Sequence, residues 1–287
     1  MEQFMIGGLL VGIDYAGMPV LSEGNLQRFR WDGPWDGEQI ALRCSYEPLS
    51  PYFGQSLIPE NHVYGIYTYE GHPFLVYRWG NQIHGFAVWP DSFRVSFAPM
   101  MHHQPPLRED WFFSVCSFHR QLLTREACIL HASYVDIGGE ALLFTGPSGV
   151  GKSTQAQLWV ENEGAQVING DRALLRKIDG RWHVFGYPTC GTSGICINRT
   201  LPLRGIVSLA QGPVNRVQML SPAAAVRTLA AAMEFYPWAQ DEFDMVLNIS
   251  SRIAADNGVM RLVCTPYKDA VTALKQFLEG GRYDDPV

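Results

Sequence analysis

A glycine-rich segment in the middle of the chain has the residue types that bind phosphate groups. It reads Gly146-Pro147-Ser148-Gly149-Val150-Gly151-Lys152-Ser153 and is followed by Thr154. In this pattern the glycines let backbone N–H groups face a phosphate, the lysine reaches the β- and γ-phosphates, and the hydroxyl after it binds Mg²⁺. The segment therefore predicts that residues 146–154 bind ATP or another nucleoside triphosphate together with Mg²⁺.

Two side chains of this segment and one beyond it are the predicted centre of the chemistry. Lys152 is the expected ligand of the γ-phosphate, and Ser153 is the expected ligand of the metal. Mg²⁺ prefers oxygen ligands and often takes one or two carboxylates, so an acidic residue at a neighbouring strand end should complete the site. Asp171 has this position, because it follows the apolar pair Val167-Ile168. A capping or turn aspartate is the alternative interpretation of Asp171.

Phosphate transfer to a hydroxyl also needs a group that accepts the proton, and two residues are candidates for it. One is Asp171. The other is His131, whose ordinary pKa of about 6.5 allows it to take a proton near neutral pH. His131 has two alternative roles, as a cation that binds the γ-phosphate or as a core histidine without a part in the chemistry.

Two arginines and one loop are further candidates for contact with phosphate. Guanidinium groups bind the spread charge of a transferring phosphoryl group well, which points to Arg199 and Arg204, although both have an equally good interpretation as surface residues. Residues 187–194 are rich in glycine and hydroxyl groups, and they either cover the acceptor or the γ-phosphate or form an ordinary loop. We count Arg204 among the candidate catalytic residues, with His131, Lys152 and Asp171.

The elements that must position these residues follow from local patterns. A strand over 141–145 leads into the glycine segment and a helix over 153–161 follows it, as the motif requires. Before them, a strand over 129–136 and the turn Gly138-Gly139 predict a hairpin. Further strands are expected at 166–169, 173–178, 182–185 and 259–264, and helices from Ser221-Pro222, over 243–255 and over 269–278.

The first part of the chain has a different character. Short aromatic or β-branched runs at 62–69, 74–79, 83–89 and 93–97 alternate with turn residues and predict an antiparallel meander. A linker is expected over 100–107, where Pro105-Pro106 stands, and a helix over 110–125. These patterns predict a smaller β-rich domain, 1–108, without catalytic motifs, and a larger domain, 109–287. We expect the first domain to recognise the acceptor.

Composition excludes several classes of partner. The net charge is −6, with 47% hydrophobic and 17% charged residues, and no basic run is present to neutralise a nucleic-acid backbone. No apolar run approaches the roughly 18 residues that span a bilayer, and the N-terminus is a poor signal peptide. The six cysteines show no CxxC pair. We expect a cytoplasmic protein with reduced thiols and no nucleic-acid or membrane partner; a homo-oligomer stays possible.

The stretch from Leu130 to Thr154 resembles the catalytic domain of HPr kinase/phosphorylase. In that family, as in ATP-type PEP carboxykinase, a histidine-bearing strand and a hairpin precede the glycine loop. The second match, Val167-Ile168-Asn169-Gly170-Asp171-Arg172, is similar to the Asp-Asp-Arg element of the family. The resemblance implies an α/β (α+β) domain with a mixed sheet of the HPr kinase/PEP carboxykinase type, over about residues 110–280, that uses ATP and Mg²⁺.

The chain also departs from the pattern of that family. Gly170 stands where the first of two paired aspartates is found, and the Pro-Val-x-x-Gly-Arg-Asn element of the family has no good counterpart. These departures predict an acceptor other than HPr and no phosphorolysis. The arrangement is more similar to HPr kinase-like proteins found beside peptide-modification genes, some of which phosphorylate a serine of a small peptide.

The sequence therefore predicts a kinase that transfers the γ-phosphate of ATP to a hydroxyl. The acceptor is either a serine of a small protein or peptide or an alcohol of a small molecule. The alternative is a nucleotide-binding regulatory or assembly module with slow or no hydrolysis, which needs no acceptor base. A carboxykinase-type lyase is a weaker third interpretation, because the sequence does not reveal the extra lysine and histidine ligands of such a site.

Overall fold

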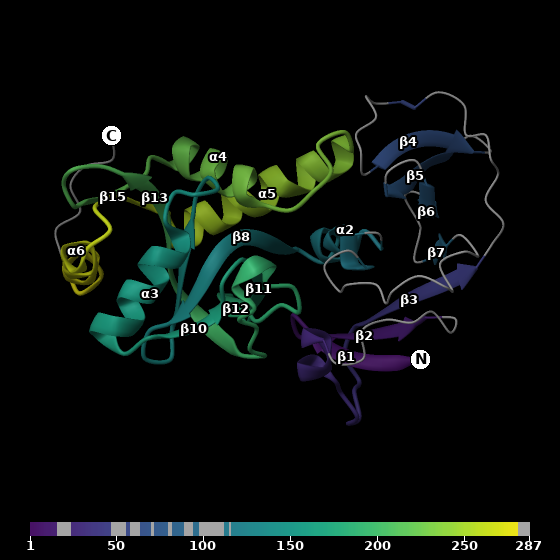
Figure 1. Cartoon of the computed structure of the whole chain (residues 1–287), viewed down its shortest axis with the longest axis horizontal. Coiled ribbons are helices and arrows are strands. Elements are labelled where there is room, and N and C mark those ends of the chain that lie inside the picture. Colours follow the sequence, from purple (N-terminus) through teal and green to yellow (C-terminus); the bar gives the residue numbers. More distant parts are fainter. Residues whose placement is uncertain are drawn as a thin grey trace. The chain divides into compact units, whose positions relative to one another are not determined.

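The computed structural model describes residues 1–15, 24–46, 56–57, 64–69, 72–79, 82–88, 94–97, 112–114 and 116–280. The chain divides into two compact units, Met1–Gln121 and Leu122–Val287 (Figure 1). The linker expected over 100–107 and the boundary expected between residues 108 and 109 lie outside the described residues. The division into domains 1–108 and 109–287 therefore stays a prediction.

The first unit contains a seven-stranded sheet with the order β1–β2–β3–β7–β6–β5–β4. The pairs β4–β5, β5–β6 and β6–β7 are antiparallel, which is the predicted meander. Strand β3 instead pairs in parallel with both β2 and β7, and long-range pairing of this kind has no local signal in the sequence. The strands are β1 (Glu2–Ile6), β2 (Leu9–Asp14), β3 (Gln39–Tyr46), β4 (Tyr64–Tyr69), β5 (His72–Trp79), β6 (Gln82–Val88) and β7 (Arg94–Phe97); the 3-10 helix η1 (Asn25–Phe29) follows β2.

The second unit contains an eight-stranded mixed sheet, and this confirms the mixed α/β class. Its order is β10–β8–β11–β12–β13–β15–β14, and β9 pairs with β8 in the antiparallel and with β13 in the parallel sense. Strand β13 is also parallel to β15. The strands are β8 (Ala127–Asp136), β9 (Ala141–Thr145), β10 (Gln166–Asn169), β11 (Arg172–Ile178), β12 (Arg181–Phe185), β13 (Thr200–Gln211), β14 (Arg216–Met219) and β15 (Met260–Cys264).

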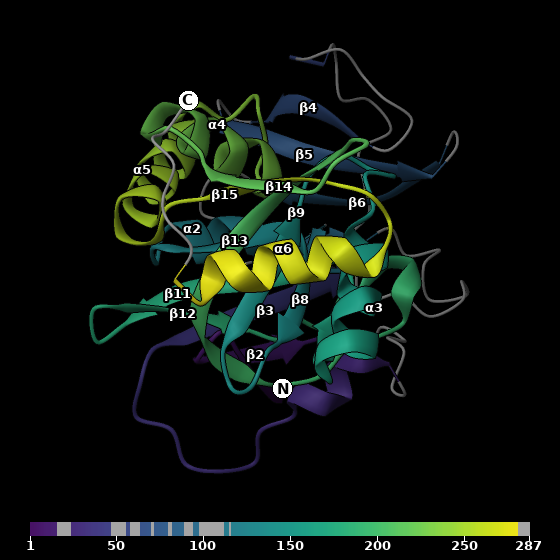
Figure 2. The same cartoon turned by 90° about the vertical axis from the view of Figure 1, so that its left-hand side faces the viewer.

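Helices cover both faces of this sheet because β9 is apolar on both of its faces. Successive side chains of a strand point to opposite faces. Leu143 packs into one buried cluster with α4 and α5, and Phe144 packs into a second cluster with α3 and α6. Figure 2 shows α3 and α6 near each other, and these two helices are in contact. The helices are α2 (Phe118–Leu123), α3 (Lys152–Glu163), α4 (Pro222–Ala232), α5 (Gln240–Asn257) and α6 (Lys268–Leu278).

The fold brings the glycine segment to the carboxyl edge of the parallel strands. Strand β9 is buried over its whole length and ends at Thr145, and α3 begins at Lys152. Gly146, Gly149 and Gly151 between them have φ values of 142°, 77° and 112°, which side chains disfavour. The loop conformation therefore depends on glycine at these three positions.

One predicted helix and one predicted helix cap differ from the structure. The helix expected over 110–125 is not continuous: residues 112–114 are helical, a turn follows at Cys116 and Ser117, where Ser117 has a φ of 49°, and α2 begins at Phe118. Asp110, its expected cap, lies outside the described residues. Pro222 does open α4, but the Ser221 side chain makes no capping hydrogen bond. No helix among the described residues is long and apolar enough to span a membrane.

Candidate functional site

The site is built on the β8–β9 hairpin and on the turn that leads into β11. His131 lies on β8 directly opposite Arg172, the first residue of β11. The preceding residue, Asp171, accepts a backbone hydrogen bond from Ala132 at 3.0 Å through its carbonyl oxygen. On the other side of the hairpin, the Thr145 hydroxyl donates to the carbonyl oxygen of His131 at 3.0 Å. The end of β9, His131 and Asp171 are thus linked by hydrogen bonds to backbone carbonyl oxygens of β8 and of the turn before β11.

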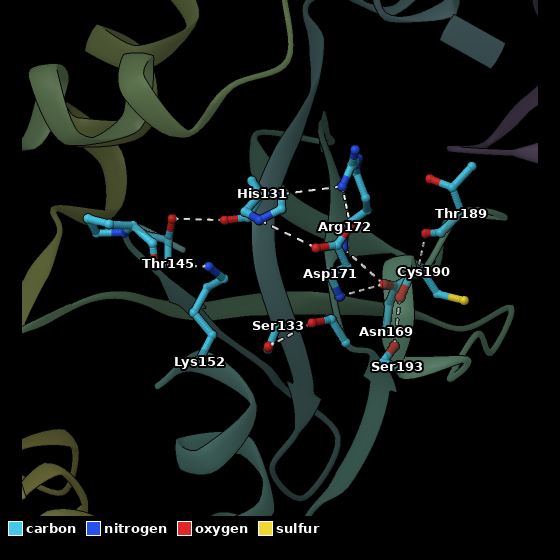
Figure 3. A network of polar contacts seen from close by, with 12 residues as sticks. His131, Ser133, Thr145, Lys152, Asn169, Asp171, Arg172, Thr189, Cys190 and Ser193 are labelled. Atoms are coloured by element: carbon cyan, nitrogen blue, oxygen red, sulfur yellow. Dashed lines mark hydrogen bonds and ion pairs between the residues drawn. The ribbon is translucent and has the colours of Figure 1, made fainter. Parts of the chain in front are cut away.

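Lys152 reaches the same region from the start of α3. Its Nζ donates to the carbonyl oxygens of Gly146 at 3.0 Å and of Pro147 at 3.3 Å, so the ammonium lies over the glycine loop. Figure 3 shows the side chain extending from α3 toward the strand that carries His131, with Asp171 beyond it. Burial lowers the pKa of Lys152, and the Asp171 carboxylate acts in the opposite direction.

A network of charges surrounds Asp171. Its Oδ2 atom accepts from Nη1 of Arg172, and its Oδ1 atom lies 3.4 Å from Nε2 of His131 (Figure 3). The same Arg172 Nη1 lies 3.2 Å from Nδ1 of His131, and Arg172 Nε donates to Oε2 of Glu234 at 3.1 Å. Burial acts to lower the pKa of Arg172, but Glu234 and Asp171 outweigh it and raise that pKa.

The network determines which nitrogen of His131 carries the proton. A guanidinium only donates, so Nδ1 facing Arg172 must be the acceptor and the proton of the neutral ring must be on Nε2, toward Asp171. The pKa of His131 is lowered mainly by burial and further by the Lys152 and Arg172 cations, against Asp171 and Glu234. His131 is therefore neutral near pH 7, and its single lone pair is already used.

Asn169 organises the turn that carries Asp171, a role that was not predicted from the sequence. It is fully buried, and its Oδ1 accepts from the backbone N–H groups of Asp171 and Arg172, both at 2.9 Å. Its Nδ2 donates to the carbonyl oxygens of Tyr187 at 2.9 Å and Thr189 at 3.0 Å. A polar residue at the end of an apolar strand is the signal that could have identified it.

Residues 187–194 pack against this turn. A Cβ atom placed on Gly170 would lie 2.4 Å from both Cβ and Oγ of Ser193, and one on Gly191 would lie 2.7 Å from Cγ of Asp171. The Ser193 hydroxyl itself donates to the Cys190 carbonyl at 2.7 Å. The absence of a side chain at Gly170 thus allows the 187–194 segment to approach Asp171 closely.

A pocket of about 570 Å³ gathers most of the candidate residues. Lys152, Ser153, Asp171 and His131 all line it, and so does Ser193 from the 187–194 segment. Two neighbouring pockets contact other parts of the glycine segment. All nine residues 146–154 line at least one of the three pockets. The first pocket is lined by Ser148, Gly149, Gly151, Lys152, Ser153 and Thr154. The second is lined by Gly146, Pro147 and Ser148, and the third by Gly149, Val150, Gly151 and Thr154.

The residues of the first pocket fit a magnesium ion in donor type. Ser153 supplies a hydroxyl and Asp171 a carboxylate, and both are oxygen donors of the kind that Mg²⁺ takes alongside water and phosphate oxygens. The part of the chain that the structure describes holds no group of three or more His, Cys, Asp or Glu residues suited to a metal. A metal held by these two residues would therefore depend on the phosphates of the nucleotide for further ligands.

The structure does not bring the two candidate arginines to this pocket. Arg204 donates to the carbonyl oxygen of Leu278, and its Nε lies 3.5 Å from Oε2 of Glu140. Arg199 pairs with Asp136 at 2.8 Å. The arginine that does contact the catalytic candidates is Arg172, whose position next to Asp171 was noted only as part of the matched motif.

Comparison with known proteins supports the family resemblance. The chain is 30% identical over 139 residues to the HPr kinase/phosphorylases of two strains of Clostridium botulinum, Eklund 17B and Alaska E43, covering 48% of this chain and 40% of each relative. The predicted similarity to HPr kinase/phosphorylase is confirmed. The chain spans less than half the length of these relatives. No protein-family model matches the chain.

The chain is also similar to solved structures. One of them is the HPr(Ser) kinase/phosphatase from Coxiella burnetii, at 13% identity and a TM-score of 0.30, and the match covers 53% of this chain and 99% of that one.

Proposed function

We propose that the chain is a kinase that uses ATP and Mg²⁺ to phosphorylate a hydroxyl group, a serine of a small protein or peptide or an alcohol of a small molecule. The observation that carries this proposal is the meeting of Lys152, Asp171 and His131 in one pocket with the hydroxyl of Ser153. A cation for the γ-phosphate, oxygen donors for the metal and a proton acceptor are the groups that phosphoryl transfer requires. The 30% identity to HPr kinase/phosphorylase supports the same reaction class.

We assign Asp171 as the group that accepts the proton of the acceptor hydroxyl. His131 is a poor acceptor in this arrangement, because Arg172 already occupies the lone pair on Nδ1. Asp171 Oδ2 is held by Arg172, while within the described part of the chain Oδ1 has only the long 3.4 Å approach to His131, which leaves lone pairs on Oδ1 for a proton. His131 and Arg172 are positioning residues that hold the carboxylate toward the acceptor.

These groups account for the bonds that form and break in the transfer step and for its proton. The acceptor oxygen forms a bond to the γ-phosphorus as the bond from that phosphorus to the β–γ bridging oxygen breaks, and ADP leaves with the electron pair. The hydroxyl proton passes to Asp171. Lys152 neutralises charge on the γ-phosphate, for which its Nζ must exchange the Gly146 and Pro147 carbonyls for phosphate oxygens. Bound Mg²⁺ would supply further charge neutralisation between Ser153 and Asp171.

A regulatory or assembly module is the competing function. A module of this kind must bind a nucleotide, but it does not need a proton acceptor that a network of hydrogen bonds holds in position. The Asn169, Arg172 and His131 contacts to Asp171 therefore favour the kinase.

The experiment that tests the proposal follows labelled phosphate from γ-³²P-ATP, with Mg²⁺, into a panel of seryl peptides, small proteins and small alcohols. We expect one class of acceptor to be labelled by the wild-type chain and not by Asp171→Asn. Nucleotide binding without label in any acceptor, together with ATP hydrolysis that Asp171→Asn does not change, would instead favour the module.

A further inference from the structure

The pocket of Lys152 and Asp171 also contains hydroxyl groups of the chain itself. Its volume is about 570 Å³, and Thr192 and Ser193 of the 187–194 segment line it together with the phosphate-binding residues. In Figure 3, Ser193 lies on the side of Asp171 away from Lys152. A hydroxyl that attacks the γ-phosphate has to approach it opposite the leaving group, with the proton acceptor at hand. The segment therefore stands where an acceptor is expected.

We propose that the chain phosphorylates its own Thr192 when no other acceptor is bound. The inference rests on the proposed kinase function and adds a modification site to it. Thr192 Oγ1 forms a bond to the γ-phosphorus as the bond from that phosphorus to the β–γ bridging oxygen breaks, and ADP leaves with the electron pair. The hydroxyl proton passes to the Asp171 carboxylate.

The backbone beside Thr192 approaches Asp171 closely. A Cβ atom placed on Gly191 would lie 2.7 Å from Cγ and 2.8 Å from Oδ2 of Asp171. Consecutive Cα atoms are about 3.8 Å apart, so the Cα atom of Thr192 lies within roughly 8 Å of that carboxylate. Gly191 and Gly194, with φ values of 56° and 66°, stand on either side of the threonine. Glycine permits backbone conformations that other residues resist, which lets Thr192 approach further.

Thr192 differs from the other hydroxyl residues of this pocket in being available. The hydroxyls of Ser133 and Ser193 donate to backbone carbonyl oxygens at 3.0 Å and 2.7 Å. Thr192 is exposed, and its hydroxyl has no hydrogen-bond partner within the described part of the chain. The remaining hydroxyl residues of the pocket belong to the glycine segment and the first turn of α3, which cradle the phosphates: Ser148, Ser153 and Thr154.

The charge of the pocket makes the modification self-limiting. A phosphothreonine carries a charge of about −1.5 to −2 at neutral pH. Lys152 is the one lysine or arginine among the described residues that line this pocket, and Asp171 already adds a negative charge. A second triphosphate would be repelled by the phosphorylated segment. We therefore expect labelling to stop at a single phosphate per chain and transfer to other acceptors to fall as it accumulates.

Incubation of the full chain with γ-³²P-ATP and Mg²⁺, without any added acceptor, tests the proposal. Trypsin cleaves after Arg181 and Arg199, so residues 182–199 form one peptide that mass spectrometry can map. We expect phosphothreonine at Thr192 in that peptide. The first-order rate constant should not change when the protein is diluted about tenfold, because hydroxyl and glycine loop belong to one molecule. A rate constant that falls on dilution, or label at another residue, would overturn the proposal.

Substitutions at Thr192 sharpen the test. Thr192→Val keeps the shape of the side chain and should lose the label, whereas Thr192→Ser keeps a hydroxyl and should give phosphoserine in the same peptide. Thr272→Val is the matched control, because Thr272 is exposed on α6 and lines none of the three pockets. It should label as the wild-type chain does. Full labelling of Thr192→Val would contradict the assignment. If that variant does not fold, the mapped site in the wild-type chain decides.

Failure of this proposal and failure of the kinase proposal give different results. A chain that labels an outside acceptor but never itself would overturn self-phosphorylation and leave the kinase intact. No label in the chain or in any acceptor, with ATP hydrolysis that Asp171→Asn does not change, would overturn both.

Discussion

Nη1 of Arg172 lies 3.2 Å from Nδ1 of His131 and at the same time donates to Oδ2 of Asp171. One guanidinium nitrogen thus serves both candidates for the proton acceptor. By occupying the histidine lone pair it removes one candidate, and by orienting the carboxylate it prepares the other. From the sequence alone, both His131 and Asp171 stayed candidates for the proton acceptor.

The first prediction concerns the relative cost of losing the two candidates. Asp171→Asn should abolish metal-dependent transfer, whereas His131→Ala should lower kcat by about tenfold, which is less than the roughly 10²–10⁴ that a general base contributes. Measured kcat values for both variants check this. If His131→Ala lowers kcat as much as Asp171→Asn does, His131 and not Asp171 is the proton acceptor.

The pH dependence of activity is the second prediction. Because burial lowers the pKa of His131, the ring stays neutral as pH falls through the ordinary histidine range near 6.5. Below its own lowered pKa it becomes a cation that can no longer accept from Arg172, and Asp171 loses its support. We expect kcat/KM to stay level from pH 7 to below 6.5 and to fall only at more acidic pH. A fall centred above 6.5 in the wild-type chain would contradict the assignment.

The third prediction concerns Lys152. Its hydrogen bonds go to loop carbonyls and not into the core, so Lys152→Ala should leave the unfolding temperature nearly unchanged and remove nucleotide binding. Calorimetric titration with ATP and a thermal unfolding curve measure the two effects. Lys275→Ala is a matched control, because Lys275 pairs with Glu163 at 2.6 Å and lines none of the three pockets. Unchanged ATP affinity in a folded Lys152→Ala variant would contradict the role of the loop.

The fourth prediction uses the close contact between Gly170 and Ser193. Gly170→Ala should raise KM and lower the unfolding temperature, since the new Cβ would lie 2.4 Å from Ser193 and force the 187–194 segment away. Adding Ser193→Gly removes both contacting atoms and should restore KM in part. Ser193→Gly alone serves as the control, because it loses the hydrogen bond to Cys190 without any clash. Strict additivity of the two substitutions would show that no clash exists.

The fifth prediction is that HPr is not the acceptor, even though the curated relatives carry its name. Gly170 in place of an aspartate and the absence of the Gly-Arg-Asn element motivate it. Incubation with HPr and labelled ATP should give no phosphoserine, and inorganic phosphate with phosphorylated HPr should give no pyrophosphate. Stoichiometric labelling of HPr would overturn this expectation.

The elements next to the glycine loop were predictable because their signals are local. The strand expected over 141–145 is β9 to the residue, and α3 differs from the expected helix by one residue at its start and two at its end. Each of these signals, whether a buried apolar run, a turn glycine or the loop motif, lies within a few residues of the element that it predicts. Asp171 was placed beside the loop by the same reasoning, from its position at a strand end.

Strand β13 was missed, although it pairs with β12, β9 and β15. Its sequence contains Pro202 and Arg204, which weaken the strand pattern, and its formation depends on partners that lie far along the chain. The ion pair between Arg172 and Glu234 could not be predicted for the same reason, because no local sequence pattern links these two residues. Arg204 was predicted to be a catalytic residue because of its charge alone. Its guanidinium instead contacts the Glu140 carboxylate and the Leu278 carbonyl oxygen.

The β8–β9 hairpin has a consequence for how ligands enter. Five residue pairs join the two strands, and the strand that bears His131 and the strand that leads into the glycine loop are therefore one rigid piece. The separation between the glycine loop and His131, which helps to position Asp171, is then set when the chain folds and does not depend on closure around a ligand. The conformational entropy of bringing these groups together has been lost before any substrate arrives, so a substrate need only displace water and reposition the Lys152 ammonium.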